Sequence, residues 1–206
     1  MSLTLLDWRR RVAALYAAVR SDTTAEPAGV LACFRAGRDR LFAEHPDSPL
    51  PVDRRPGFRG LPYWAYDPAL RFEVEVGPAP SERLTAISST GEPYPLDRIG
   101  RVTVPMGTLD VFWVAVYGGG VFLPFRDTTS GGESYGGGRY LLDTVKGADL
   151  GGGEGKLVVD FNYAYNPSCA YDPQWSCPLA PPANRLTVPI LAGERYLGEH
   201  HIDEHD

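Results

Sequence analysis

The hydrophobic period of the chain changes once, close to residue 63, and this change sets the fold class. Before it, apolar residues recur every three to four positions in the ranges 4–20 and 27–43, which is typical of helices with one buried face. After it, apolar and polar residues alternate, most clearly over residues 70–76. Such alternation is typical of half-buried strands. The sequence therefore predicts two helices followed by strands.

Further strands are predicted along the rest of the chain. The range 109–117 is apolar on both faces, so we expect this strand in the middle of a sheet. No long helical pattern separates the strands, which argues against a parallel α/β sheet. We therefore predict a mainly β fold, an antiparallel β-barrel or curved β-sandwich with two N-terminal α-helices. The other predicted strands cover residues 83–89, 99–106, 121–125, 139–145, 156–162, 185–191 and 195–197.

The whole chain, residues 1–206, is expected to form a single domain, because this length suffices for one hydrophobic core. Its parts are a helical segment over 1–45, a Pro-rich connection over 46–62, a β core over 63–198 and a polar tail over 199–206. The connection is interpreted as a surface loop, with an interdomain linker as the alternative. The helices alone are too short for a separate core, which favours the loop.

The charge balance excludes some classes of partner. The formal net charge is −6 and no extended Lys/Arg run occurs, which argues against nucleic-acid binding. No apolar run reaches the roughly 18 residues of a membrane span, so no membrane association is predicted. The N-terminus does not resemble a signal peptide, and we expect a soluble, cytoplasmic protein. The sequence specifies neither a cofactor nor an oligomeric state, and a small molecule is the expected ligand.

Two polar segments, 125–141 and 160–195, contain the residues suited to chemistry. Asp127 and Glu133 bracket a loop rich in Gly and hydroxyl side chains, and Asp160 lies on a predicted strand. Carboxylates in different environments can divide the roles of acid and base. The candidate catalytic residues are therefore Asp127, Glu133 and Asp160. A hard-cation site built from these carboxylates and Asn carbonyls is an alternative, although no metal ligand is assigned.

Arg139 begins a predicted strand and is expected to bind an anionic group, because its planar guanidinium can hold a carboxylate through two hydrogen bonds. The group is either part of a ligand or one of the chain's own acids, with Asp160 or Glu133 as the expected partner. Neighbouring amides and phenols would orient a ligand or form the walls of its site. The candidate ligand-binding residues are Arg139, Tyr135, Asn162, Tyr165 and Asn166.

Cysteine and histidine are not expected to act in catalysis. Cys169 and Cys177 lack the paired spacing of a zinc site and are interpreted as packed thiols in a reducing compartment, with a disulfide as the alternative in an oxidising one. Cys33 is expected in the core. Apart from His45, the His residues lie in the polar tail, which is interpreted as a solvated terminus.

The two polar segments resemble the motifs of domain-of-unknown-function family 1684, found in bacteria and archaea. The resemblance implies no activity, because the family has none assigned. It places the motif residues in the same two segments. Two positions depart from the pattern, with Ser134 in place of Thr and Asp172 in place of Asn or Thr. The first motif consists of Phe125–Gly131, Glu133, Tyr135 and Gly138–Leu141; the second of Asp160–Asn162, Ala164–Pro167, Cys169–Tyr171, Cys177–Leu179, Asn184–Leu186 and Ala192–Glu194.

Two functional hypotheses follow from the polar segments. In the first, the chain is a small-molecule-binding domain, with the three carboxylates in one pocket and an enzymatic role for them. In the second, it is a non-catalytic binding or structural module whose polar residues form buried hydrogen-bond networks. The hypotheses differ in a visible way, because only the second predicts that the polar groups satisfy one another.

Overall fold

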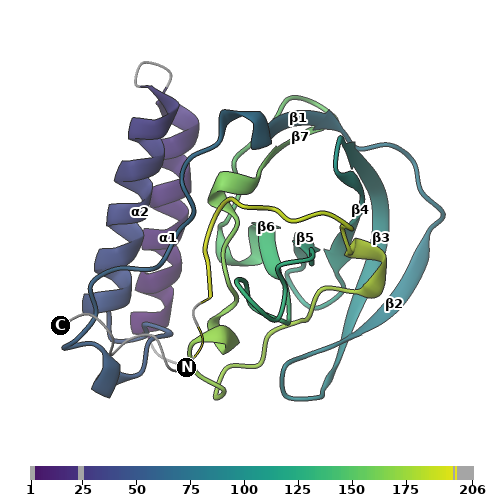
Figure 1. Cartoon of the computed structure of the whole chain (residues 1–206). Coiled ribbons are helices and arrows are strands. Elements are labelled where there is room, and N and C mark those ends of the chain that lie inside the picture. Colours follow the sequence, from purple (N-terminus) through teal and green to yellow (C-terminus); the bar gives the residue numbers. More distant parts are fainter. Residues whose placement is uncertain (1–2, 23–25, 197, 199–206) are drawn as a thin grey trace.

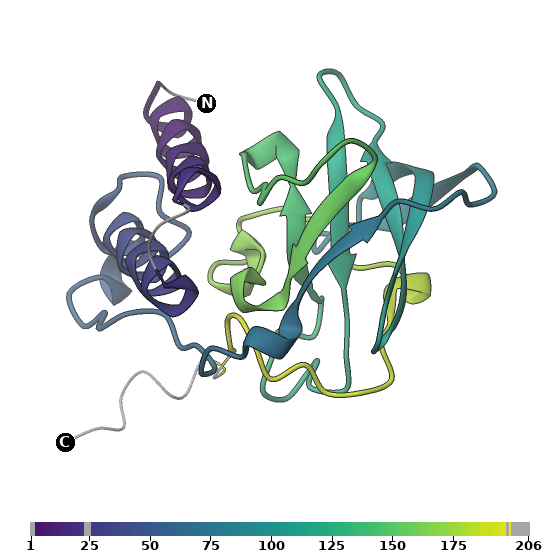
Figure 2. The same cartoon turned by 90° about the horizontal axis from the view of Figure 1, so that it is seen from above.

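Two helices lie beside a β part in the computed structural model, which describes residues 3–22, 26–196 and 198. Figure 1 shows the helices next to each other, and Figure 2 shows both on the same side of the β part. Within these described ranges, no helix is long and apolar enough to cross a bilayer. The polar tail predicted over 199–206 lies outside the described residues.

Helix α1 runs over Leu3–Ser21 and helix α2 over Pro27–Glu44, which confirms both predicted helices. Pro27 suits the first turn of α2, because a residue there needs no N–H donor. The helices approach closely at Gly37, where an added Cβ would lie 2.5 Å from Leu15 Cδ2. A residue larger than glycine would therefore require the Leu15 side chain to shift.

The main sheet has five antiparallel strands in the order β2-β3-β4-β5-β6. The strand predicted to be central is β4, in the middle of this order, and most of its side chains are buried. Each neighbouring pair is consecutive in the chain, and the longest connection within the sheet is the segment 126–138 between β5 and β6. The strands are β2 (Glu82–Ile87), β3 (Pro93–Val104), β4 (Gly107–Val114), β5 (Gly120–Phe125) and β6 (Arg139–Asp143).

A second sheet pairs β1 (Arg71–Glu75) with β7 (Lys156–Asp160), and these strands are antiparallel. The alternation predicted over 70–76 is confirmed, because Phe72 and Val74 pack on the core while their neighbours are exposed. Both sheets contribute to one hydrophobic cluster. Its members include Val102, Val111, Leu123, Phe125, Val159 and Phe161.

The helices join the β part through a second hydrophobic cluster. Tyr16 of α1 meets Phe34 of α2 edge to face at 4.9 Å between ring centres, and Phe34 meets Tyr163 at 5.0 Å. Such aromatic contacts add to the free energy gained from burying the rings. Short 3₁₀ turns complete the chain at Val52–Arg54, Pro68–Leu70, Thr144–Lys146, Phe161–Tyr163, Ser168–Ala170 and Pro182–Asn184.

The mainly β fold with two N-terminal helices is confirmed, whereas the expected closure into a barrel is not. The described strands form two open sheets, of five and two strands. The strand predicted over 185–191 is wrong, because Pro189 has no N–H to donate and Ile190 bonds to side chains instead of a strand. The described part of the strand predicted over 195–197 is also irregular.

Candidate functional site

The most deeply buried basic side chain among the described residues is that of Arg139, at the start of β6, with 1% of the residue exposed. Its Nη2 donates to Asp127 Oδ2 at 3.1 Å and to the Ile190 carbonyl at 2.9 Å. Its Nη1 donates to the carbonyls of Ala192 at 2.5 Å and Glu194 at 3.3 Å. Arg139 therefore ties the C-terminal segment to the sheet.

The Asp127 carboxylate is fully buried and has donors on both oxygens. Its Oδ1 accepts from the hydroxyls of Thr129 at 2.7 Å and Ser130 at 3.2 Å. Its Oδ2 accepts from Arg139 and from the backbone N–H of Ile190 at 2.6 Å. We refer to Asp127, Thr129, Arg139 and the backbone of 190–194 as the Asp127–Arg139 network. Its charges are mutually satisfied, as a buried ion pair requires.

Two aromatic rings cover the Arg139 guanidinium. Its Cζ lies 4.8 Å from the ring centre of Trp64 and 4.9 Å from that of Phe125. Burial lowers the pKa of Arg139, and the nearby Asp127 carboxylate offsets part of this effect. The resulting pKa of Arg139 is about 10. The group thus stays charged at neutral pH and has no face open to a ligand anion.

The other two candidate carboxylates lie elsewhere. Asp160 Oδ1 accepts from the backbone N–H and the side-chain Nδ2 of Asn162, each at 2.9 Å, and Oδ2 lies 3.9 Å from Arg71 Nε. Burial raises the pKa of Asp160. Glu133 is largely exposed, and its carboxylate lies 3.6 Å from Arg195 Nη2.

These placements correct the expected arrangement of the candidate site. Arg139 pairs with Asp127, and neither Asp160 nor Glu133 is its partner among the described contacts. The reason is strand register, since β5 and β6 pair Phe125 with Arg139 and thereby bring Asp127 beside the guanidinium. The structure assembles no common site from Asp127, Glu133 and Asp160, because each carboxylate has its own partners.

Among the candidate amides, Asn162 joins two segments 95 residues apart in sequence. Its Oδ1 accepts from Asp67 N–H at 2.9 Å, and its Nδ2 donates to the Asp67 carbonyl at 2.8 Å. This pair of bonds holds the turn before β1 against the end of β7. Asn162 is therefore occupied by backbone groups.

A second buried network is centred on Glu194, a residue that was not among the predicted site residues. Glu194 is fully buried, and its Oε1 accepts from Arg38 Nε at 2.7 Å. Its Oε2 accepts from Asn166 N–H at 2.6 Å and from the Tyr171 hydroxyl at 2.7 Å. Because Arg38 lies on α2, these bonds anchor the helices to the β part.

A different environment occurs between α1 and the main sheet. A hollow of about 250 Å³ lies there, and its lining includes Trp8, Tyr94, Asp143, Lys146, Trp175 and Cys177. A smaller hollow of about 40 Å³ adjoins it and shares Trp8 and Lys146. We call the two hollows the helix–sheet cleft. Aromatic walls with a few polar groups are typical of small-molecule sites.

The main acidic group of the helix–sheet cleft is Asp143, at the end of β6, with 5% of the residue exposed. Burial raises the pKa of this carboxyl, while Lys146, Arg9 and a hydrogen bond from Tyr165 lower it in part. Lys146 Nζ lies 3.9 Å from Asp143 Oδ2. A raised carboxyl pKa within a cleft marks a candidate functional group.

Several buried polar atoms of the cleft have no hydrogen-bond partner among the described residues. They include Asp47 Oδ2 and Trp175 Nε1 in the larger hollow, and the Tyr16 hydroxyl and Asn166 Oδ1 in the smaller one. Buried polar groups are usually satisfied, and each exception needs an explanation. The cleft thus contains buried polar atoms without partners, whereas the carboxylates of the two buried networks have hydrogen-bond donors on both oxygens.

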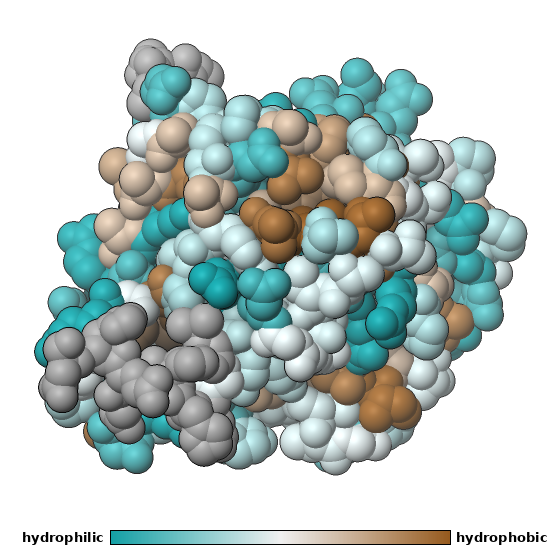
Figure 3. All heavy atoms as spheres, in the orientation of Figure 1, coloured by the Kyte–Doolittle hydropathy of each residue, from teal (hydrophilic) through white to brown (hydrophobic). Residues whose placement is uncertain are grey.

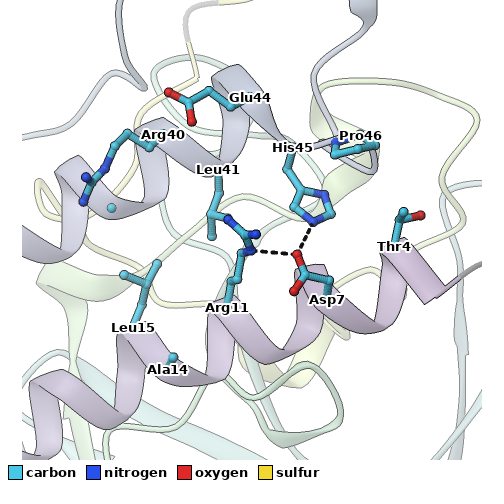
Figure 4. Close-up of a pocket in the computed structure, with 11 residues that line it drawn as sticks. Thr4, Asp7, Arg11, Ala14, Leu15, Arg40, Leu41, Glu44, His45 and Pro46 are labelled. Atoms are coloured by element: carbon cyan, nitrogen blue, oxygen red, sulfur yellow. Dashed lines mark hydrogen bonds and ion pairs between the residues drawn. The ribbon is translucent and has the colours of Figure 1, made fainter.

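The largest hollow, of about 650 Å³, is an open groove between α1 and α2 (Figure 4). Its one imidazole, from His45, is already engaged: Nδ1 accepts from Asp47 N–H at 3.1 Å, and Nε2 lies 3.2 Å from Asp7 Oδ2. Arg11 also bonds to Asp7, at 2.7 Å. The polar side chains of the groove are therefore hydrogen-bonded to one another. Because the helix–sheet cleft contains unpartnered polar atoms instead, we place the candidate site there.

The face shown in Figure 3 carries separate groups of hydrophobic residues among polar ones. Within the described part of the chain, no group of three or more His, Cys, Asp or Glu residues is arranged to hold a metal ion.

Residues 56–195 match the model of the family "Protein of unknown function (DUF1684)". The chain belongs to the DUF1684 family. No curated protein matches the chain. The match confirms the resemblance noted from the sequence motifs, and it covers the Asp127–Arg139 network and, apart from Arg38, the network centred on Glu194.

Among solved structures, this DUF1684 chain is similar to an uncharacterised protein of Haloarcula marismortui whose solution structure was determined by NMR. The two share 33% sequence identity, the alignment covers 80% of this chain and 91% of that one, and the TM-score is 0.53. The likeness extends to most of both chains. It assigns no activity, since the archaeal protein is itself uncharacterised.

Sequence reasoning found part of the DUF1684 cleft and missed the rest. Tyr165 and Asn166 were predicted as ligand-binding residues, and both line the smaller hollow. Asp143 and Lys146 were missed, although a carboxylate at the end of a buried strand followed by a lysine three residues later was a visible signal. The other missed residues, Trp8, Tyr16, Asp47 and Trp175, come from distant segments, and no local pattern connects them.

Proposed function

We propose that this DUF1684 domain binds a small polar molecule in the helix–sheet cleft. The observation that carries the proposal is the set of buried polar atoms there without partners, from Tyr16, Asp47, Asn166 and Trp175. A ligand that supplies hydrogen bonds to these atoms would remove the free-energy cost of burying them.

The cleft defines the class of ligand. Carboxylates of Asp47 and Asp143 accept hydrogen bonds, whereas Lys146 and the Trp175 indole donate them. We therefore expect a molecule with both donor and acceptor groups, such as an amino acid. The larger hollow, at about 250 Å³, lies just below the usual range for drug-sized ligands, about 300–1,000 Å³, which favours a small metabolite.

The proposal reassigns the residues expected from the sequence. Tyr165 and Asn166 keep their ligand-binding role, and Asp143 replaces Asp127, Glu133 and Asp160 as the functional carboxylate. Arg139 becomes a structural residue. We also place this function in the cytoplasm, because the free cysteines of the chain suit a reducing compartment.

A second candidate function is proton transfer by Asp143. The raised pKa of this buried carboxyl favours it, since a carboxyl that titrates closer to neutral pH exchanges protons more effectively near that pH. In this case the domain would be an enzyme acting on the same small ligand. Binding without turnover remains the primary proposal, because it needs only the unpartnered atoms.

Ligand binding can be tested with a panel of amino acids, amines and short carboxylic acids, measured by thermal shift and intrinsic tryptophan fluorescence. We expect at least one amino acid to raise the Tm of the wild-type protein. We expect Asp143→Asn and Trp175→Phe to weaken its binding about tenfold or more, the loss typical of a charged hydrogen bond.

The matched control is Trp113→Phe, because Trp113 lies on β4, is 42% exposed and does not line the cleft. This variant should bind like the wild type. A compound that binds all three variants equally tightly would place its site outside the cleft, and a panel in which no amino acid binds would contradict the proposed ligand class.

A further inference from the structure

Cys169 and Cys177 are separated by eight positions in the chain and meet in space. Cys169 lies in the 3₁₀ turn Ser168–Ala170 and is partly exposed, whereas Cys177 is 1% exposed. The Cys177 thiol is hydrogen-bonded to the Cys169 sulfur. A half-exposed thiol in contact with a buried one is the arrangement that a two-step thiol exchange needs.

The segment that carries Cys177 is fixed by Ser89, just after β2. The Ser89 N–H donates to the Cys177 carbonyl at 2.8 Å, and the Cys177 N–H donates to Ser89 Oγ at 3.1 Å. Ser89 Oγ in turn donates to the Trp175 carbonyl at 2.9 Å. The Cys177 backbone is thereby held on both sides.

The Cys169 sulfur is surrounded by hydrogen-bond donors. The Tyr135 hydroxyl lies 3.5 Å from it, and the Cys177 thiol also contacts it. Donors stabilise the thiolate over the thiol. These contacts, with that of Cys177 as the largest, lower the pKa of Cys169 to about 6 against the effect of burial. The pKa of Cys177 is raised by the same contact and by burial.

We propose that Cys169 and Cys177 form a thiol–disulfide exchange site, with Cys169 as the attacking sulfur and Cys177 as the resolving one. The substrate class is a small-molecule disulfide. Burial of Cys177 is no obstacle, because its attack is intramolecular and follows the contact already made between the two sulfurs.

The exchange balances in two steps. The Cys169 thiolate attacks one sulfur of the small disulfide, the S–S bond of that molecule breaks, and one thiolate leaves. Cys177 then loses its proton, and its sulfur attacks Cys169 and expels the second small thiolate. Both expelled thiolates are protonated from Cys177 and solvent. The two cysteines together lose two electrons, which reduce the small disulfide to two thiols.

Glutathione disulfide is a suitable probe, with the full chain and its variants analysed by mass spectrometry after alkylation of free thiols. We expect the wild type to form one internal disulfide between Cys169 and Cys177. Cys177→Ser should instead accumulate glutathione on Cys169, because the resolving sulfur is missing. In Cys169→Ser, Cys177 should form neither an internal disulfide nor a glutathione adduct. Recovery of both thiols unmodified in the wild type would overturn the proposal.

Cys33 is the internal control for alkylation, because it is exposed on α2, contrary to the core position expected from the sequence, and lies outside this pair. The pH dependence of alkylation should have its midpoint near pH 6 for Cys169, below the ordinary thiol value of about 8.5. The midpoint is a better readout than the rate, since a thiolate of lower pKa is a weaker nucleophile.

Tyr135→Phe provides a second variant that keeps both cysteines. It removes one donor to the thiolate, so the midpoint for Cys169 should shift upward relative to the wild type. If the midpoint for Cys169 in the wild type lies at or above the ordinary thiol value of about 8.5, or if Cys177→Ser gains no glutathione, the assignment of Cys169 as the attacking sulfur is wrong.

Discussion

The Asp127–Arg139 network and the helix–sheet cleft contain the same kinds of side chain in opposite states. In the network, the Asp127 carboxylate has a donor for each oxygen, and Arg139 reaches three carbonyls besides. In the cleft, polar atoms of several lining residues have no partner among the described residues. One region satisfies its polar groups internally, and the other does not.

This difference separates structure from function more clearly than residue type does. A buried ion pair with every hydrogen bond made contributes a fixed geometry to the fold and has nothing left to offer a ligand. Unpartnered atoms cost free energy in the folded protein, so a site that retains them has a use for them. The predictions below test this contrast.

The largest effect is expected from Arg139→Met. The substitution leaves the buried Asp127 carboxylate without its counter-charge and the carbonyls of Ile190 and Ala192 without their donor. Breaking a buried pair from one side costs about 3–5 kcal/mol. Urea unfolding should therefore show a loss of this size in the free energy of unfolding, or no folded protein.

Two further variants make this result specific. Asp127→Asn combined with Arg139→Met should recover part of the loss, because no unpaired charge then remains buried. Arg83→Met should have no measurable effect, since the Arg83–Asp97 pair is exposed. A stable Arg139→Met protein that has lost ligand binding would reverse the roles assigned to the two regions.

The sequence predicted that Arg139 binds an anionic group, either of a ligand or of one of the chain's own acids, but it could not identify which one. Asp160 and Glu133 were the expected partners, and the choice of Asp127 depends on the β5–β6 register, in which Phe125 lies opposite Arg139. A one-residue change of register would turn Arg139 to the other face of the sheet. Partner choice is thus decided by tertiary structure, even within one motif.

Local patterns succeeded where burial alone decides the structure. The alternation over 70–76 predicted β1, and the doubly apolar range 109–117 predicted the central strand β4. They failed over 185–191, where Leu186 and Ile190 are buried as in a strand but the backbone bonds to side chains. Glu194 and Arg38 are 156 residues apart, so no sequence window contains both.

A smaller, pH-dependent effect is expected from Asp143→Asn in the cleft. Burial raises the folded-state pKa of Asp143 above its ordinary value near 3.9, so the folded protein binds the proton more tightly than the unfolded chain. This contribution to stability is complete below pH 3.9 and is lost as the pH rises through the folded-state pKa. The Asn variant should therefore gain stability relative to wild type over that interval, by urea unfolding at each pH.

The sign of this difference is the test. Lys146 and Arg9 lower the pKa of Asp143 and so act against the effect of burial. If they dominated, the wild type would gain stability relative to the Asn variant as the pH rises. That outcome would make Asp143 a member of a stabilising ion pair, like Asp127, and would remove the contrast between the two regions for this residue.

The smallest effects come from two tyrosines that differ in one contact. The Tyr171 hydroxyl donates to Glu194 at 2.7 Å, whereas the buried Tyr16 hydroxyl has no partner among the described residues. Tyr171→Phe should therefore lower the free energy of unfolding by about 2 kcal/mol, the contribution of a hydrogen bond to a charged group. Tyr16→Phe should leave it unchanged or raise it by up to about 1 kcal/mol, because it removes an unsatisfied buried hydroxyl.

Chemical denaturation of both variants measures the change in the free energy of unfolding, and the ligand affinity of each variant completes the comparison. If the cleft binds its ligand through Tyr16, the phenylalanine variant gains stability and loses affinity, whereas equal destabilisation of both variants would mean that the Tyr16 hydroxyl is satisfied in solution and that the cleft does not differ from the networks.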